Sequence, residues 1–216
     1  MKKELIIEDG IIAGNIYDKY GTGNPIEKYL VAGFIHAVDK LFCSTNACNI
    51  HEIGCGEGHL SIALARRHPG VRLRACDLSQ QVINLAIDNS IKAGVDIKFQ
   101  VASVYDLSFE ENTAELVVCC EVLEHLEYPG RALEVLCQLA NPYLIVSVPH
   151  EPIWSILNLI RGKYLTRLGN TPGHVQRWSK ASFIQLIDSY MDIIEVLTPL
   201  PWIIVLCRRR TMSNLD

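Results

Sequence analysis

Short apolar runs alternate with amphipathic stretches along most of the chain after residue 48. Seven runs rich in Val, Ile and Leu predict strands at 49–53, 71–76, 96–102, 115–120, 144–148, 192–197 and 202–207. Between several of these runs, apolar residues recur at helical spacing, and Ser79 and Ser179 are well suited to cap two of the helices. This alternation predicts an α/β domain with a mainly parallel sheet.

Two of the runs, "ELVVCC" (115–120) and "LIVSV" (144–148), show almost no polar alternation. Such continuous runs are typical of central strands that are buried on both faces. The last two runs are joined only by "TPLP" (198–201), which is too short for a crossover helix. We therefore expect the last two strands to pair antiparallel.

The pattern before residue 46 differs, because it predicts one long helix. Asn24 is a suitable cap, Pro25 suits the first helical position, and Glu27 follows three residues after the cap. We interpret residues 1–45 as an N-terminal helical cap and residues 46–216 as the main domain. A segment at 150–178 containing Pro and Trp interrupts the rhythm and is interpreted as an insertion.

Composition narrows the class of protein. The chain has 216 residues, 49% of them hydrophobic, and a net charge of −4, with one basic run at 207–210. A nucleic-acid partner is therefore not favoured.

No apolar run is long enough for a membrane span, and Glu8 and Asp9 interrupt the first apolar stretch, which argues against a signal peptide. Eight cysteines without a CxxC pair favour a reducing, cytoplasmic setting. No pattern assigns an oligomeric state.

The segment "HEIGCGEGHL" (51–60) places Gly54, Gly56 and Gly58 between the first predicted strand and the next helix. Glycines at this junction let the backbone turn sharply and approach a ligand. The spacing lacks the third glycine of the dinucleotide pattern GxGxxG, which argues against an NAD or FAD enzyme. Asp77 ends the second strand, where a carboxylate can accept both hydroxyls of a ribose. The sequence therefore predicts a nucleoside site.

The segment "CCEVLEHLEYPG" (119–130) brings acidic and basic side chains to the end of the fourth strand. Its Glu and His residues could be metal ligands, a general base, or the polar start of a helix. Histidine has a pKa suited to proton removal near neutrality, and His125, His150 and His174 fall at strand ends or in the insertion. They are the candidate bases, whereas the other four histidines are interpreted as surface or packing residues.

"EIGCGEG", Asp77, "EVLEHL" and "LIVSVP", in this order and spacing, resemble the class I S-adenosylmethionine-dependent methyltransferases over roughly residues 48–207. The resemblance implies a doubly wound, Rossmann-like sheet of seven mostly parallel strands with an antiparallel last strand. It also implies S-adenosylmethionine as cofactor and transfer of its methyl group to a small-molecule acceptor, most simply at oxygen. Aromatic residues of the insertion, such as Trp154, suit a flat or hydrophobic acceptor, or they simply anchor the insertion.

The resemblance also implies a set of cofactor-binding residues. In it Asp77 holds the ribose, Leu78 and Val104 lie against the adenine, and Ser103 stands where the family often has an aspartate. Core packing is the alternative for Leu78 and Val104. The full set is Glu52, Gly54, Cys55, Gly56, Gly58, Asp77, Leu78, Ser103, Val104 and Glu121.

A metal is the second reading of "EVLEHL". Ubiquinone-type O-methyltransferases and enzymes that methylate the 3′ ends of small RNAs have a similar ExxEH that coordinates a divalent ion. The corresponding set here is Glu121, Glu124, His125 and His174. We favour the metal-free reading, in which Glu121 faces the cofactor and Glu124 begins a short helix. The competing functions are a metal-assisted RNA 2′-O-methyltransferase and a non-catalytic module that binds S-adenosylmethionine.

Overall fold

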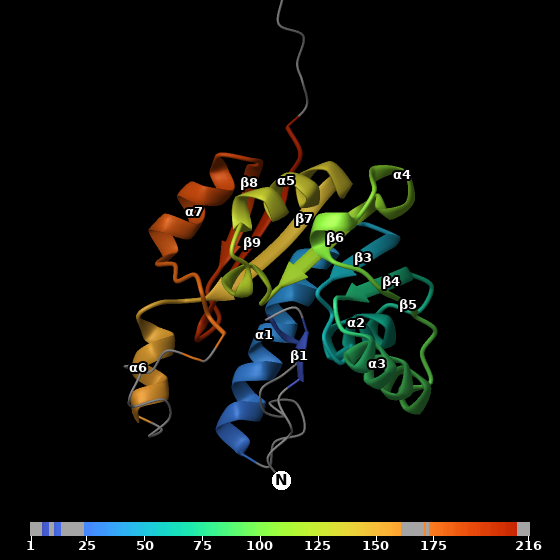
Figure 1. The fold of residues 1–216 in the computed structure, drawn as a ribbon, viewed down its shortest axis with the longest axis horizontal. Helices are drawn as coiled ribbons and strands as arrows, with labels where there is room; N and C mark the ends of the chain where they lie inside the picture. The colour runs from blue at the N-terminus through green and yellow to red at the C-terminus, as the bar shows by residue number, and fades with distance from the viewer. Residues whose placement is uncertain (1–5, 9–10, 14–23, 161–170, 172, 211–216) are drawn as a thin grey trace, which may run out of the picture.

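The protein is built on one seven-stranded sheet, which Figure 1 shows in a computed structural model. The structure describes residues 6–8, 11–13, 24–160, 171 and 173–210. In chain order, the strands of the sheet are β3 (Asn49–Ile53), β4 (Arg72–Asp77), β5 (Lys98–Val101), β6 (Ala114–Cys120), β7 (Ala140–Pro149), β8 (Asp192–Leu197) and β9 (Trp202–Arg208). All seven predicted strands are present.

The strands lie in the order β5-β4-β3-β6-β7-β9-β8. The first five are parallel to one another, whereas β9 runs antiparallel to both β7 and β8. The predicted mostly parallel sheet with an antiparallel last strand is therefore confirmed. The chain moves outward from β3 to β5 and then returns to β6, so the strand order reverses between β3 and β6. Open α/β sheets bind ligands at the carboxyl ends of the strands beside such a reversal.

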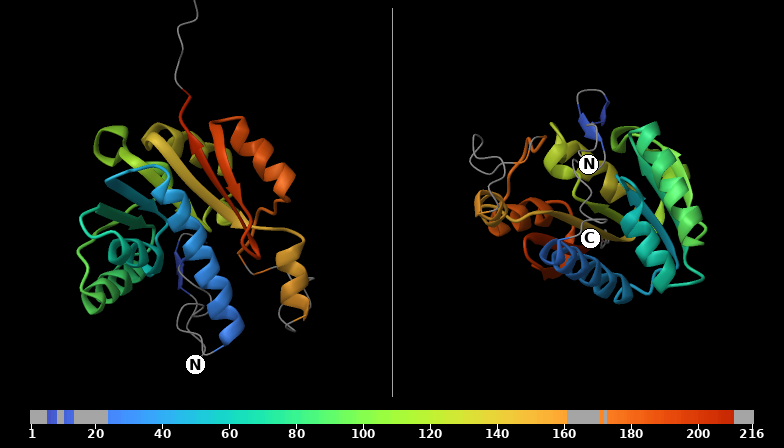
Figure 2. Two further views of the ribbon diagram at one scale, coloured as in Figure 1. Left: turned by 180° about the vertical axis from the view of Figure 1, so that it is seen from behind. Right: turned by 90° about the horizontal axis from the view of Figure 1, so that it is seen from below.

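Helices cover both faces of this sheet (Figure 2). The hydrophobic core on one face includes residues of α1, α2 and α3, and the core on the other includes residues of α5 and α7. The helices are α1 (Pro25–Cys43), α2 (His59–Arg67), α3 (Gln80–Ala93), α4 (Phe109–Asn112), α5 (Pro129–Leu139), α6 (Ile153–Ile160) and α7 (Lys180–Asp188). Short 3-10 turns are η1 (Val104–Asp106) and η2 (Leu123–His125), and a small hairpin consists of β1 (Ile6–Glu8) and β2 (Ile11–Ala13).

Strand β6 shows why a continuous apolar run belongs in the centre of this sheet. Side chains alternate between the faces of a strand, so Leu116 and Val118 join the core beneath α1 to α3. Val117 and Cys119 join the core beneath α5 and α7. All four are fully buried. The neighbouring β7 is longer than its predicted run at 144–148, because its earlier residues also pair with β6 and β9.

Helix α1 begins as its sequence predicts, with the Asn24 side chain accepting a hydrogen bond from the backbone N–H of Ile26 at 3.0 Å. Its apolar side, including Val38 and Leu41, is buried on the same face of the sheet as α2. Both α1 and α6 extend beyond the carboxyl ends of the strands (Figures 1 and 2). The division at residue 45 remains a prediction; it falls in the turn between α1 and β3.

The predicted insertion contains α6, and its end returns to the sheet through a bridge between His150 and Trp178. Residues 161–170 and 172 of the insertion, and residues 1–5, 9–10 and 14–23 of the predicted cap, lie outside the described part of the chain. Among the described helices, none combines the length and the hydropathy that crossing a bilayer requires.

Candidate active site

The glycine segment forms a tight turn between β3 and α2. Gly54, Gly56 and Gly58 all have positive φ angles, of 75°, 54° and 78°, a conformation that side chains disfavour. The backbone N–H groups of Gly54 and Cys55 both donate to the carbonyl of Cys76, at 2.8 and 2.9 Å. These bonds fix the turn at the carboxyl end of β4.

The turn also lies against the segment that follows β6. A Cβ atom added to Gly54 would lie 2.2 Å from Cγ2 of Val122. Since this distance is far below van der Waals contact, glycine is required here for close approach as well as for its φ angle. The segments after β3 and after β6, on either side of the strand reversal, therefore touch directly.

Glu52 is buried beneath the glycine turn, with 4% of its surface exposed. The hydroxyl of Ser61, in α2, donates a hydrogen bond to its carboxyl group. Burial raises the pKa of Glu52 to about 8, although the bond from Ser61 acts in the opposite direction. This carboxyl group links the end of β3 to the first turns of α2, on either side of the glycines.

Asp77 connects the end of β4 to the same turn. Its Oδ2 accepts a hydrogen bond from the backbone N–H of Gly56 at 2.8 Å, and its Oδ1 accepts one from Ser79 at 3.2 Å. The carboxylate therefore holds the middle glycine and the start of α3 at once. Gly56 and Asp77, 21 residues apart, form one structural unit at the carboxyl edge of the sheet.

The remaining residues of the predicted cofactor site are less polar than Glu52 and Asp77. Cys55 is buried, and burial raises the pKa of its thiol far above the ordinary value. Leu78 is half-buried. Val104 is buried in the core beside β6, and the hydroxyl of Ser103 accepts a bond from the N–H of Tyr105 at 3.3 Å. Ser103 thus caps η1 within the described structure.

Glu121 follows β6 in a left-handed conformation, with a φ angle of 61°. Its carboxylate points toward β7 and β9: Oε1 accepts from the hydroxyl of Ser147 at 3.1 Å, and Oε2 accepts from the indole N–H of Trp202 at 2.7 Å. These contacts place its carboxylate on the β7 and β9 side of β6, away from β3 and β4. That it also faces the cofactor remains a prediction.

His125 and His174 come together beside η2. Their rings make an edge contact with centroids 5.0 Å apart, and Nδ1 of His125 lies 3.0 Å from the carbonyl oxygen of Gly173. The candidate ligand atoms of Glu124, His125 and His174 all lie within 4.8 Å of one another. Glu121 is not in this group, so three of the four residues of the metal reading converge.

Backbone bonds hold the end of the insertion against η2. The N–H groups of Val175 and Gln176 both donate to the carbonyl of Glu124, at 2.8 and 3.0 Å. His150 lies elsewhere, at the end of β7, where its backbone N–H donates to the carbonyl of Pro201 at 2.9 Å. Among the described residues, the structure therefore pairs His125 with His174 and leaves His150 outside the cluster.

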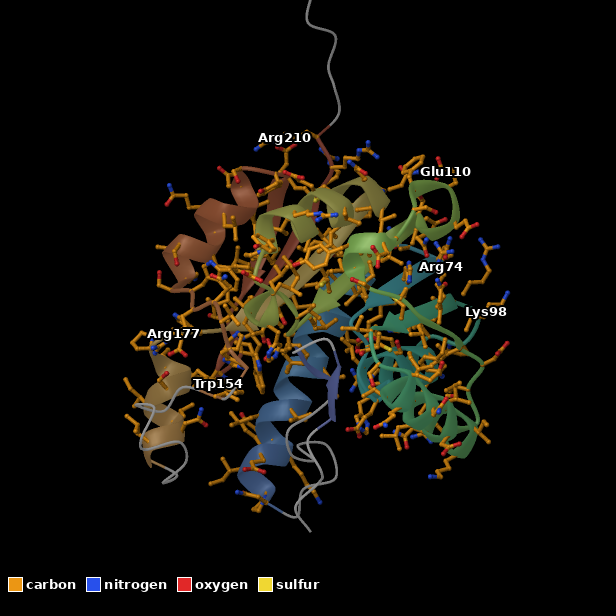
Figure 3. All side chains as sticks on the ribbon, viewed as in Figure 1. Arg74, Lys98, Glu110, Trp154, Arg177 and Arg210 are labelled. Atoms are coloured by element: carbon orange, nitrogen blue, oxygen red, sulfur yellow. The ribbon has the colours of Figure 1, made fainter. Side chains whose placement is uncertain are left out.

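A row of aromatic rings continues from this cluster toward α1. The ring of Trp154 lies 6.1 Å from that of His174 and 5.9 Å from that of Trp202, and Trp202 lies 5.0 Å from Phe34. Figure 3 shows Trp154 between α6 and the end of the sheet. Sequence reasoning did not assign Trp202, Ser147, Ser61 or Phe34 to the site. No local motif identifies them, because only the fold brings them there.

The remaining described histidines have other surroundings. His51 is buried in β3, and burial lowers the pKa of its ring to about 4. His59 lies 3.4 Å from a carboxylate oxygen of Glu57, and His68 lies 2.6 Å from one of Asp39. The exposed basic end of β9 is far from the candidate site, as the positions of Arg210 and Trp154 in Figure 3 show.

Comparison with known proteins shows which proteins this chain resembles. Residues 50–142 match the family model described as a methyltransferase domain. The ubiquinone biosynthesis O-methyltransferase of Xanthomonas euvesicatoria pv. vesicatoria (strain 85-10) is 30% identical over 151 residues, which cover 63% of this chain and 62% of that protein. The chain thus spans less than two thirds of the length of that relative.

Two solved structures share the fold. The magnesium protoporphyrin IX methyltransferase of Synechocystis PCC 6803, with bound SAH, superposes with a TM-score of 0.67 at 22% identity, covering 89% of this chain and 91% of that one. The methyltransferase domain of bacterial CtHen1-CN superposes with a TM-score of 0.67 at 20% identity, covering 83% and 99%. At these identities the likeness establishes the fold.

Proposed function

We propose that this chain, which contains a class I S-adenosylmethionine-dependent methyltransferase domain, transfers the methyl group of that cofactor to an oxygen of a small-molecule acceptor. The product of the cofactor would be S-adenosylhomocysteine. One observation carries the proposal most strongly: Asp77 and Gly56 form a unit at the strand reversal, directly beside the segment after β6 that carries His125. We also propose a cytoplasmic location.

The side of the site on β3, β4 and β5 would bind the cofactor. The turn from Gly54 to Gly58, with Cys55, would pass under its methionine part, while Glu52 orients that turn from below. Asp77 would accept hydrogen bonds from the ribose, in addition to those it accepts from Gly56 and Ser79. Leu78, Ser103 and Val104 would flank the adenine.

The transfer itself needs little acid–base chemistry, because the sulfonium is already a good leaving group. The protein must hold the acceptor in line with the methyl group and exclude water. A hydroxyl acceptor must also lose a proton, and we assign this role to His125. A ring nitrogen that bonds a carbonyl oxygen carries a proton, so Nδ1 of neutral His125 is the donor and Nε2 is the basic nitrogen. His174 and His150 are the further candidates.

The side of the site on β7, β9 and α6 would bind the acceptor. The rings of Phe34, Trp202, Trp154 and His174 follow one another there. Phe34 and Trp202 are buried, whereas the rings of Trp154 and His174 are half-buried and would offer the flat surface that favours a planar or hydrophobic acceptor. Relatives named for ubiquinone biosynthesis O-methylation favour oxygen as the methylated atom.

A metal-assisted version of the same reaction is the second candidate, favoured by the convergence of Glu124, His125 and His174. Carboxylate oxygen and imidazole nitrogen suit magnesium, manganese or zinc, so the donor set fits a divalent ion. These three residues would hold it. Such an ion would polarise the acceptor oxygen and lower the pKa of its hydroxyl.

An RNA acceptor and a purely cofactor-binding role find less support. An RNA acceptor would require a cationic surface at the site. Among the described residues, the exposed arginines at 208–210 lie at the far end of the sheet, and Arg177, beside Trp154, lies 3.6 Å from a carboxylate oxygen of Glu151. A non-catalytic cofactor-binding module would not require the acceptor side to carry paired histidines beside an aromatic row.

The decisive experiment incubates the purified protein with methyl-labelled S-adenosylmethionine and a cell extract, then identifies labelled products by mass spectrometry. We expect a labelled small molecule whose formation stops in Asp77→Ala, with S-adenosylhomocysteine affinity reduced at least about tenfold, or 1.4 kcal/mol. Unchanged affinity in that variant would refute the cofactor site. Activity that survives a strong chelator would refute the metal candidate, and labelled RNA alone would refute the small-molecule acceptor.

A further inference from the structure

The turn after β6 contains an unusual backbone conformation. Glu121 and Asn46 are the non-glycine residues with positive φ in the described chain, and Glu121 has a φ of 61°. Asparagine adopts this region readily, whereas glutamate does so rarely. The surroundings of Glu121 must therefore hold it in place.

Two side chains from neighbouring strands hold the Glu121 carboxylate. Ser147 of β7 donates to one oxygen and Trp202 of β9 donates to the other, at 3.1 and 2.7 Å. The backbone N–H of Glu121 adds a bond to the Ser147 carbonyl at 3.1 Å. Trp202 is itself fixed, because it is 4% exposed and contacts the rings of Phe34 and Trp154.

The held residue lies between the two halves of the candidate site. Directly after it, Val122 sets how closely the glycine turn can approach through its contact with Gly54. The chain then enters η2, which ends at His125, the histidine beside His174. A change in the Glu121 backbone would therefore move His125 relative to the cofactor side.

We propose that Trp202 and Ser147 are positioning residues, which lock the backbone of Glu121 and thereby set the position of His125 relative to the glycine turn. Neither needs to touch cofactor or acceptor for this role. The kinetic consequence rests on the methyl transfer proposed above, whereas the structural consequence can be measured without it.

The test uses Trp202→Phe, which keeps an aromatic ring beside Phe34 and Trp154 but removes the indole donor, and Ser147→Ala. The matched control is Trp178→Phe, since the ring of Trp178 packs against Phe183 of α7. We expect both test variants to shift the imidazole NMR signals of His125, with S-adenosylhomocysteine affinity within about twofold of the unmodified protein. We expect kcat for the labelled acceptor to fall about tenfold, and the control to change none of these quantities.

A double-variant comparison separates positioning from simple loss of packing. Glycine accepts a positive φ, so Glu121→Gly removes the carboxylate while it permits the same backbone. If Trp202 acts through Glu121, adding Trp202→Phe to Glu121→Gly should cause no further shift of the His125 signals. Additive shifts, or unchanged His125 signals in Trp202→Phe, would overturn the inference. A protein with no transferase activity but with these shifts would refute the proposed function and keep the positioning role.

Discussion

Gly54 and Gly94 have similar positive φ angles, of 75° and 68°, yet a side chain would meet different surroundings at the two positions. At Gly94, which caps α3, a Cβ atom would meet nothing within 4 Å, whereas at Gly54 it would overlap Val122. We expect Gly94→Ala to lower the free energy of unfolding by about 1–2 kcal/mol, from the left-handed backbone alone. Gly54→Ala should cost about 1–3 kcal/mol more, and should also weaken S-adenosylhomocysteine binding.

Urea unfolding and calorimetry of the two variants measure these effects. Adding Val122→Ala to Gly54→Ala removes the overlapping methyl groups, so it should recover part of the lost stability. If the two single variants were equally destabilised, close approach would not be the reason for glycine at position 54.

Glu52 and His51, adjacent in β3, give opposite contributions to the pH dependence of stability. The pKa of Glu52 is raised to about 8 in the folded protein, so its contribution is present below the unfolded value near 4.5 and is lost as pH rises toward 8. The pKa of His51 is lowered to about 4, so its contribution is present above pH 6.5 and is lost as pH falls through 4. The two slopes oppose each other between about 4.5 and 6.5.

The effect of Glu52 should therefore be clearest between about pH 6.5 and 8. We expect the stability of the unmodified protein to fall across that interval, and Glu52→Gln to remove most of the fall, because glutamine does not titrate. Urea midpoints measured at several pH values provide the comparison. An equal slope in both proteins would contradict a raised Glu52 pKa.

Among individual residues, the sequence predicts well those whose role depends on local geometry. Gly54, Gly56 and Gly58 are recognisable because a strand-to-helix turn requires them, and Asp77 because it ends a strand. Ser147 and Trp202 are not recognisable, since they reach Glu121 across 26 and 81 residues. The direction of the Glu121 carboxylate depends on them, so it could not be predicted either.

Helix α1 is the element whose relation to the sheet is most readily tested. Leu41 is fully buried against the sheet, whereas Leu85 of α3 is 37% exposed. We expect Leu41→Ala to lower the free energy of unfolding by about 2–5 kcal/mol, because it leaves a cavity in the core. Leu85→Ala, the matched control, should cost less than about 1 kcal/mol. A small effect of Leu41→Ala on a single unfolding transition would indicate a detachable cap.

Helices were predicted well where their apolar residues recur at helical spacing and a capping residue marks the start. Helix α3 begins after Ser79, which accepts a bond from the N–H of Val82, and it ends at Gly94, as its sequence indicates. The sequence did not predict a helix in the insertion, because "IWSILNLI" has the reverse of the usual pattern: polar Ser155 and Asn158 are buried, whereas Ile156 and Leu159 are exposed. What fixes its end is the tertiary pairing of residues 175–176 with η2.

Across the whole molecule, the eight free cysteines differ in how deeply they are buried, so we expect them to react in steps with a thiol reagent. Cys43 and Cys48 are exposed and should react first. Cys137 is half-buried and should react slowly, since burial raises the pKa of its thiol to about 11. The five buried thiols should react only after unfolding, as measured by thiol titration with and without denaturant. More than three reactive thiols in the folded protein would contradict this packing.

Strand β9 lies between β7 and β8, although both precede it in the chain. During synthesis β8 therefore has no partner in the sheet, and β7 keeps an unpaired edge, until β9 emerges and pairs with both. Trp202, the first residue of that strand, is also the donor to Glu121. A growing polypeptide could thus form the glycine turn and its Asp77 contact early. Its acceptor side would form only when β9 pairs with β7, because Trp202 then reaches Glu121. The last step of sheet formation therefore also completes the site.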